Sequence, residues 1–185
     1  MKSDKVIKVN KLDAAISQTI TAIELYFQGK DSLSVHTLAA AAYNIFKDLS
    51  KKHGTKLMLL KQSFPEILDA ESRKKWMASI NRYENYLKHA DTDSDKELAY
   101  NPLVTEFVLA DLCGKMQEIF QHGPPIVMTY MLWFMAKTHL KPKIIKENKK
   151  EFVEKAMNDY KIGKNDFYKK YFPVAVSSLV KIMKE

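Results

Sequence analysis

The sequence predicts an all-α protein, a single-domain helical bundle of seven or eight helices without a significant β-sheet. Three observations lead to this prediction. Apolar residues recur every three or four positions through most of the 185 residues, and strand-like alternation is nearly absent. Hydrophobic residues make up 46% and charged residues 28% of the chain, which is an ordinary globular composition. Only 5 glycines are present, so folds that hold phosphate in glycine-rich loops are effectively excluded.

The first two helices are predicted at residues 10–28 and about 31–54. In both segments the apolar side chains repeat with the period of an α-helix. Gly29 supplies the stop for the first helix, and Asp31 or Ser32 can cap the start of the second. Because the connection is short, the two helices are expected to form an antiparallel hairpin.

The rest of the chain continues the helical pattern. An irregular or one-turn link at 55–65 precedes a helix from about 66 or 71 to 89, and a polar loop follows it. Asn101-Pro102 is a good start signal for the next helix, since proline is tolerated at a first helical position. The remaining helices are expected at 101–123, 125–140, 143–161 and 165–184. Pro173 is expected to kink or divide the last of them.

The chain is expected to be one domain over residues 1–185, with a core at about 10–140 and a basic helical C-terminal extension at about 141–185. The net charge is +8, and residues 137–185 hold 13 lysines against 6 acidic residues. A lysine-rich region of this kind can attract RNA or an acidic partner, although lysines also simply solubilise helix exteriors. Arginine occurs only at Arg73 and Arg82, which disfavours sequence-specific reading of DNA.

A cytoplasmic location is predicted from the cysteine content and from the apolar segments. Cys113 is the only cysteine, which excludes an intramolecular disulfide and suits a reducing compartment. The N-terminal segment lacks the apolar run of a signal peptide. The most apolar stretch, 126–136, is shorter than the roughly 20 residues of a membrane span, so no span is expected. No cofactor is predicted.

Arg82, Asn85 and His89 are the candidate catalytic residues. At 100° per residue they lie on one face of the predicted helix, away from its apolar stripe. An arginine can stabilise negative charge on a phosphate, and a histidine can move a proton near neutral pH. The alternative is that they form the solvated polar face that any amphipathic surface helix carries.

Six residues separate Arg82 from His89. This spacing resembles the arginine-and-histidine motif of HEPN domains. These are small all-helical proteins that often act as metal-independent ribonucleases. The resemblance implies that His89 would activate a ribose 2′-hydroxyl, that Arg82 would stabilise the charged phosphorane and that Asn85 would orient one of them. It also implies an active site formed across a homodimer.

Two longer segments resemble an uncharacterised bacterial all-helical family. They are His-Thr-Leu-Ala-Ala-Ala-Ala at 36–42 and Asn-Tyr-Leu-Lys-His-Ala-Asp at 85–91. The resemblance implies a helical fold and brings no activity with it. It marks His36, Lys88 and Asp91 as candidate binding residues, beside the candidate catalytic ones.

His36 also belongs to a third hypothesis, a metal-dependent hydrolase. Its ligands would be His36, His89 and Asp91, with Glu106 or Asp111 brought in by the bundle. The small residues after His36 leave room for a ligand, but a hydrogen-bonded histidine in the core explains the same pattern. Since the sequence offers no glutamate and histidine at the i, i+3 spacing of bundle metal sites, no metal site is predicted.

The preferred hypothesis is a helical binding or interaction module, with the ribonuclease as the alternative. It rests on the absence of any complete catalytic motif in the sequence. Exposed apolar surface would then serve a partner or a homodimer. Methionine and aromatic residues at 128–135 are expected to be core, and a partner groove is the alternative for them.

Overall fold

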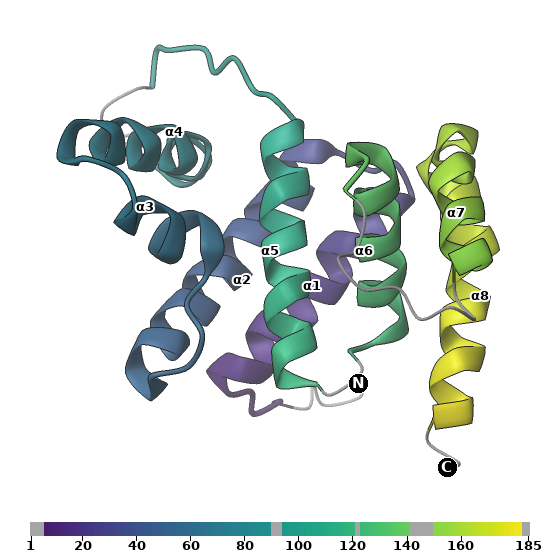
Figure 1. The fold of residues 1–185 in the computed structure, drawn as a ribbon. Helices are drawn as coiled ribbons and strands as arrows, with labels where there is room; N and C mark the ends of the chain where they lie inside the picture. Colours follow the sequence, from purple (N-terminus) through teal and green to yellow (C-terminus); the bar gives the residue numbers. More distant parts are fainter. Residues whose placement is uncertain (1–5, 90–93, 121–122, 141–149, 183–185) are drawn as a thin grey trace, which may run out of the picture.

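Residues 6–89, 94–120, 123–140 and 150–182 are described by the computed structural model (Figure 1). Within these ranges the chain forms eight α-helices and no strand, which confirms the all-α prediction and the expected number of helices. The helices are α1 Lys11–Phe27, α2 Ser32–His53, α3 Phe64–Glu66, α4 Ala70–Lys88, α5 Leu103–Ile119, α6 Pro125–Thr138, α7 Lys150–Asp159 and α8 Lys164–Ile182.

Helices α1 and α2 pack side by side along their length, as the hairpin prediction requires. Each start is capped by a side chain: Asn10 accepts a hydrogen bond from the amide of Asp13 at 2.8 Å, and Asp31 accepts one from Ser34 at 2.7 Å. Gly29 lies between them with a φ of 68°. Since this left-handed conformation suits glycine, the residue ends α1 and turns the chain into α2.

Helix α5 lies in the middle of the bundle, between α6 on one side and the α2–α4 segment on the other (Figure 1). Its buried apolar residues meet those of α1, α2 and α6 in one core cluster. Helix α6 is buried on most sides, which explains its nearly continuous apolar sequence. Its Trp133 donates a hydrogen bond from the indole nitrogen to the Tyr26 hydroxyl of α1 at 3.1 Å. The predicted core helix at 125–140 is therefore confirmed.

Helices α7 and α8 pack against α6 at one edge of the molecule (Figure 1). Ala156, Phe167 and Tyr171 are the residues that these two helices bury in the core. Helix α8 runs through Pro173 without interruption, so the predicted division of this helix is wrong. Pro173 is exposed, so the carbonyl that its missing N–H leaves free can be hydrated. The first part of the expected 143–161 helix lies outside the described residues.

The link after α2 is more regular than the sequence predicted. Residues Leu59–Ser63 form a π-helical turn, η1, and α3 follows it directly. Asp111 of α5 holds the start of this turn by accepting hydrogen bonds from the amides of Leu59 and Leu60 at 3.1 and 2.9 Å. Trp76 of α4 donates a further bond to the Leu60 carbonyl at 2.7 Å.

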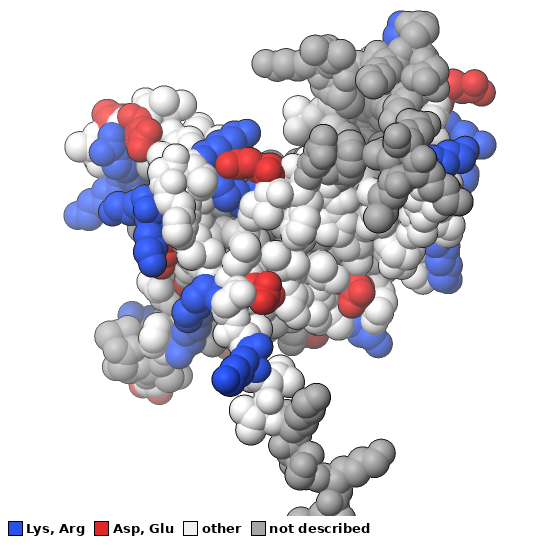
Figure 2. Space-filling model, turned by 90° about the horizontal axis from the view of Figure 1, so that it is seen from below, with Lys and Arg blue, Asp and Glu red and all other residues white. Residues whose placement is uncertain are grey.

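Charged side chains are unevenly spread over the face seen in Figure 2. Much of the middle of this face is white, and many lysine and arginine side chains gather on the left, where α2 ends and where α3 and α4 lie in Figure 1. In the part of the chain that the structure describes, no helix combines the length and the apolar character needed to cross a membrane.

Candidate functional site

A buried carboxylate lies at the contact between α2, α4 and η1. Glu84 follows Ile80 by one helical turn, so the inward face of α4 carries an acid where an apolar residue would be expected. Three side chains hydrogen-bond to it: Lys61 from η1 at 2.6 Å, Lys88 at 2.7 Å and Asn44 of α2. A buried charge is tolerated only when it is paired in this way.

Lys61 is as deeply buried as its partner, with 5% of its side chain exposed. Its ammonium group also donates to Asn44 at 3.2 Å and lies 5.5 Å from the centre of the Tyr43 ring. Burial lowers the pKa of Lys61. Burial alone would raise the pKa of Glu84, but the hydrogen bonds from Lys61 and Lys88 outweigh it and lower this pKa to about 2. Glu84 is therefore a carboxylate throughout the neutral pH range.

His36 lies on α2 beside this ion pair, with 1% of its surface exposed. Its Nδ1 is hydrogen-bonded to the Thr105 hydroxyl at 2.9 Å, and Thr105 is bonded in turn to Tyr100. The imidazole packs edge to face against the rings of Tyr83 and Tyr100, with 5.8 Å between ring centres in both pairs. Burial lowers the pKa of His36 to about 4, although Glu84 acts in the opposite direction.

The second nitrogen of His36, Nε2, makes no hydrogen bond to any described residue. A cavity of about 10 Å³ lies beside the ring, lined by His36, Ala40, Tyr43, Lys61, Ile80, Glu84 and Val108. This volume matches a single water molecule and is far too small for a substrate. The His36 neighbourhood is therefore a structural cluster in which Nε2 faces a space the size of one water molecule.

Arg82 lies on the opposite side of α4 from Glu84, and Asn85 lies to one side of Glu84. Both are exposed, and so is His89. Their side chains make no hydrogen bond or ion pair with the rest of the described chain. His89 is the C-cap of α4 with an extended backbone (φ −132°), so the helical phase that grouped it with Arg82 ends one residue before it. His36 is buried behind the helix, and the structure gives these two histidines no common pocket.

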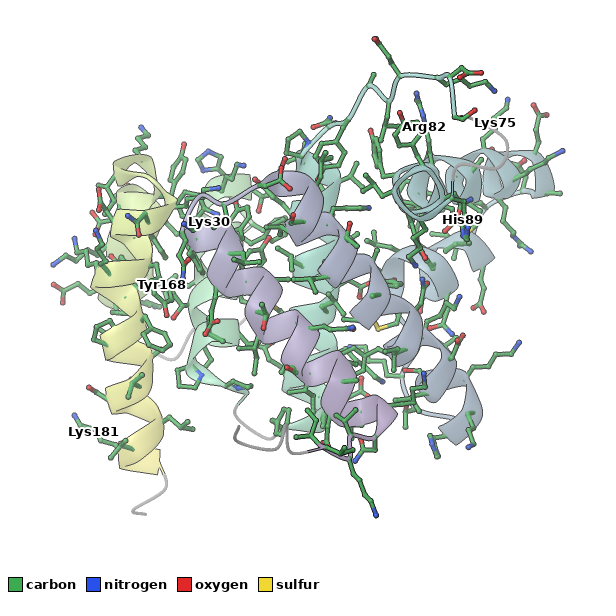
Figure 3. All side chains as sticks on the ribbon, turned by 180° about the vertical axis from the view of Figure 1, so that it is seen from behind. Lys30, Lys75, Arg82, His89, Tyr168 and Lys181 are labelled. Carbon is green, nitrogen blue, oxygen red and sulfur yellow. The ribbon has the colours of Figure 1, made fainter. Side chains whose placement is uncertain are left out.

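The candidate binding residues His36, Lys88 and Asp91 do not form one site with the candidate catalytic residues in the described part of the chain. Lys88 joins the buried cluster through Glu84, although its own surface is exposed. Asp91 lies outside the described residues. Figure 3 shows Arg82 and His89 on α4 at one edge of the molecule, and Tyr168 and Lys181 of α8 at the other. The candidate catalytic residues and the described lysines of α8 therefore do not form one continuous surface.

The described lysines of the C-terminal region are partly neutralised. Lys170 pairs with Asp159 at 2.5 Å, and Lys169 lies 3.7 Å from Asp166. The Lys164 ammonium lies 4.4 Å from the centre of the Tyr26 ring. Four further lysines at 141–149 lie outside the described residues. The described part alone thus offers a weaker attraction for RNA than its composition predicted.

The acidic residues proposed as metal ligands have other partners. Glu106 accepts hydrogen bonds from Tyr26 at 2.8 Å and from Lys137 at 2.6 Å. Asp111 accepts one from Tyr43 at 2.5 Å, besides the two amides of η1. Among the described residues, no three histidine, cysteine or acidic side chains lie close enough to hold a metal ion together.

A groove of about 530 Å³ runs along the exposed side of α5. Its floor is formed by Phe107, Ala110 and Gly114, which follow one another along the same face of the helix. One bank is the segment after α2 with η1, and the other is formed by α6 and the residue just beyond it. The lining residues are Lys56, Leu57, Met58, Leu59, Leu60, Ser63, Phe107, Ala110, Asp111, Gly114, Lys115, Glu118, Met131, Phe134 and Leu140.

The groove exposes more apolar surface than a bundle needs. Leu59, Phe107 and Leu140 are 56%, 43% and 54% exposed, and they line a single hollow. A contiguous apolar surface of this kind is typical of a binding site, whereas scattered exposed leucines are not. Met131 and Phe134 line it too. The 128–135 segment is mainly core, as predicted, since Tyr130, Trp133 and Phe134 are buried in the core cluster.

Gly114 leaves a space in the floor of the groove. It lies inside α5, is exposed, and has a helical backbone, so its conformation does not require glycine. A Cβ atom built there would meet no other atom of the described chain within 4 Å. Glycine inside a helix costs about 0.5–1 kcal/mol relative to alanine. The packing within the described chain therefore does not explain why this position is a glycine and not an alanine.

Sequence reasoning found His36 and Lys88 but missed the residues that connect them. Glu84 was detectable, because it lies in phase with the Trp76 and Ile80 stripe. Lys61 was not, because it comes from a segment predicted as an irregular link. The groove was also hidden, since its two banks come from separate parts of the chain.

Replacing Glu84 tests the buried ion pair. Glu84→Gln leaves the Lys61 ammonium buried without a counter-charge, so we expect the free energy of unfolding to fall by about 3 kcal/mol. Urea denaturation measures this change. Glu71→Gln is the matched control, because Glu71 forms an exposed ion pair with Lys75 on the same helix at 2.6 Å. It should cost less than about 0.5 kcal/mol, and equal losses in the two variants would contradict the assignment.

The buried His36 predicts a loss of stability in mild acid. The folded protein keeps this imidazole neutral down to about pH 4, whereas an unfolded histidine takes up a proton near pH 6.5. The stability is therefore fully present above pH 6.5 and is lost as the pH falls toward 4. Between pH 7 and pH 5 we expect a loss of about 2 kcal/mol in urea denaturation. His36→Asn should remove most of this dependence and His89→Asn should keep it; the reverse result would refute the assignment.

Comparison of the chain with known protein families, with curated proteins and with solved structures gave no match. The resemblance to HEPN domains and to a bacterial helical family therefore stays a prediction from short motifs. The function has to be argued from the two features that the structure describes, the buried cluster around Glu84 and the groove over α5.

Proposed function

We propose that this chain is a cytoplasmic helical interaction module that binds a partner helix in the groove over α5. The groove carries the proposal: exposed apolar side chains from η1, from α5 and from Leu140 after α6 meet there. Interfaces of this type take the apolar side of an amphipathic helix as anchors at helical spacing. The lone buried cysteine, Cys113, is consistent with a reducing compartment.

The floor of the groove suits a helix better than a small molecule. Small-molecule sites need a few free polar groups to orient the ligand. Two polar groups of this lining are already engaged, since Asp111 accepts a hydrogen bond from Tyr43 and Lys115 donates one to the Lys56 carbonyl at 2.8 Å. Ala110 and Gly114, one turn apart, instead let another backbone approach α5 closely.

The buried cluster around Glu84 supports this function indirectly. It fixes Lys61, and through it the η1 turn that forms one bank of the groove. The Asp111 carboxylate of α5 fixes the start of the same turn by accepting hydrogen bonds from two of its backbone amides. The η1 turn is therefore held by hydrogen bonds at its start and at its middle residue, so the groove is preformed and a partner does not have to order it.

Gly114 provides the test of this proposal. Gly114→Ala should raise the free energy of unfolding by about 0.5–1 kcal/mol, because the added methyl group meets nothing and alanine favours the helix. Gly114→Leu should fill the floor. A fluorescent amphipathic peptide with leucines at helical spacing and uncharged flanks should then bind the wild type and lose at least about tenfold in affinity for Gly114→Leu, measured by fluorescence anisotropy.

Ala78→Leu is the matched control, since Ala78 is exposed on α4, away from the groove. It should leave peptide binding unchanged. Equal binding to the wild type and to Gly114→Leu would refute the groove as the binding site. A clear loss of stability in Gly114→Ala would show that the fold itself requires this glycine, which would remove the argument from it.

A HEPN-like ribonuclease is the second candidate, and the exposure of Arg82, Asn85 and His89 is the observation that favours it. These side chains are free to meet RNA or a second copy of the chain. The interaction module predicts no RNA cleavage that depends on them. Purified protein should therefore leave total RNA intact in the presence of EDTA, as judged on a denaturing gel. Cleavage by the wild type that disappears in His89→Ala would establish the ribonuclease instead.

A further inference from the structure

The bank of the groove formed by the segment after α2 is basic. Lys51 and Lys52 lie in the last turn of α2, and Lys56 lines the groove itself. All three are exposed, and none forms an ion pair with another described residue. Leu57 comes next in the chain, and it lines both the groove and a second hollow.

This second hollow has a volume of about 450 Å³ and is lined by Lys47, Asp48, Lys51, Leu57, Lys61, Gln62 and Glu66. Asp48 lies 3.7 Å from Lys47, and Lys61 is paired with Glu84. That leaves Lys51 and Glu66 without an ion pair in the described chain. Together with Lys52 and Lys56, the outer side of the bank carries an excess of unpaired positive charge.

The acids that line the groove do not offset this charge. Asp111 is occupied by Tyr43 and by two backbone amides. Glu118 lies 3.2 Å from the Lys115 ammonium, which also donates to Thr55 and to the Lys56 carbonyl. A ligand in the groove would thus meet an apolar floor and, on the bank, Lys56; Lys51 lies in the neighbouring hollow, which shares Leu57 with the groove.

From this arrangement we propose that the partner of the groove is an acidic amphipathic helix, with leucine-like anchors on one face and carboxylates along one flank. The inference rests on the interaction function proposed above and adds the chemistry of the partner. Phe107 and Glu118 both line the groove and are eleven residues apart on α5, so the hollow extends over about 16 Å, or three helical turns. An elongated apolar hollow beside unpaired lysines matches a helix in which anchors and acids lie on adjacent faces.

The test compares two labelled peptides of about 18 residues, or five helical turns. They share the same leucine spacing and differ only in their flanks, which carry glutamate in one and lysine in the other. At about 50 mM salt, the wild type should bind the acidic peptide about tenfold more tightly, the ratio that two exposed ion pairs supply. The ratio should shrink at about 300 mM salt, because exposed charges are screened.

The charge-reversal variant Lys51→Glu/Lys56→Glu should lose this preference or reverse it. Its matched control is Lys74→Glu/Lys75→Glu, the same change of charge on exposed residues of α4. This control should keep the preference for the acidic peptide. An equal affinity of the wild type for both peptides, or a tighter binding of the basic one, would overturn the inference.

The two proposals fail in different ways. Equal affinity for both peptides that is still abolished by Gly114→Leu would leave the groove standing and refute only the acidic partner. Binding of either peptide that is insensitive to Gly114→Leu would refute the groove and the inference together. If an oligoribonucleotide bound through Lys51 and Lys56 and displaced the acidic peptide, these lysines would belong to an RNA site, and the acidic partner would be wrong.

Discussion

The architecture depends on two buried carboxylates, Glu84 and Glu106, on the half-buried Asp111, and on the need to pair each of them. Glu84, Glu106 and Asp111 would each destabilise the core if they were left without partners. Each is bound by side chains or amides from other elements, so each contact ties helices together. Glu106 connects α5 to α1 and α6, Asp111 connects α5 to α2 and η1, and Glu84 connects α4 to α2 and η1.

These hydrogen-bonded carboxylates fix how neighbouring helices are aligned, which apolar packing alone does not do. Hydrophobic contacts stabilise a bundle without selecting one register between neighbouring helices. A carboxylate held by two or three donors does select it, because the donors must come within hydrogen-bonding distance together. The uncovered side of α5 follows from this arrangement: η1 is held on one side by Asp111 and α6 on the other by Glu106, and the groove is the space between them.

Much of the fold could be predicted from the sequence, because helical periodicity, capping residues and glycine stops are local signals. Asn10, Asp31 and Gly29 act as their types and positions predict. Pro173 does not divide α8, because an exposed proline inside a helix can leave the free carbonyl of the preceding turn to water. The π-helical turn was not predictable, since the donors and acceptors that hold it, Asp111 and Gln62 among them, include a residue some fifty positions away.

The candidate site could be predicted only in part, for the same physical reason. His36 was found as a histidine beside small residues, but its partner Thr105 comes from a helix far along the chain. Arg82, Asn85 and His89 were grouped by helical phase, and phase says which residues share a face without saying whether that face meets protein or solvent. The groove depends on what is missing opposite α5, and a sequence pattern does not contain that information.

The two tryptophans of the chain lie in different parts of the fold, Trp76 beside η1 and Trp133 between α6 and α1. The indole of Trp76 is bonded to the η1 carbonyl beside the Glu84 cluster, and that of Trp133 to Tyr26 in the core of α1 and α6. They are the chain's only tryptophans. Each half of the molecule thus contains its own intrinsic fluorophore, and single-tryptophan variants would reveal by emission alone whether the two halves melt together or one after the other.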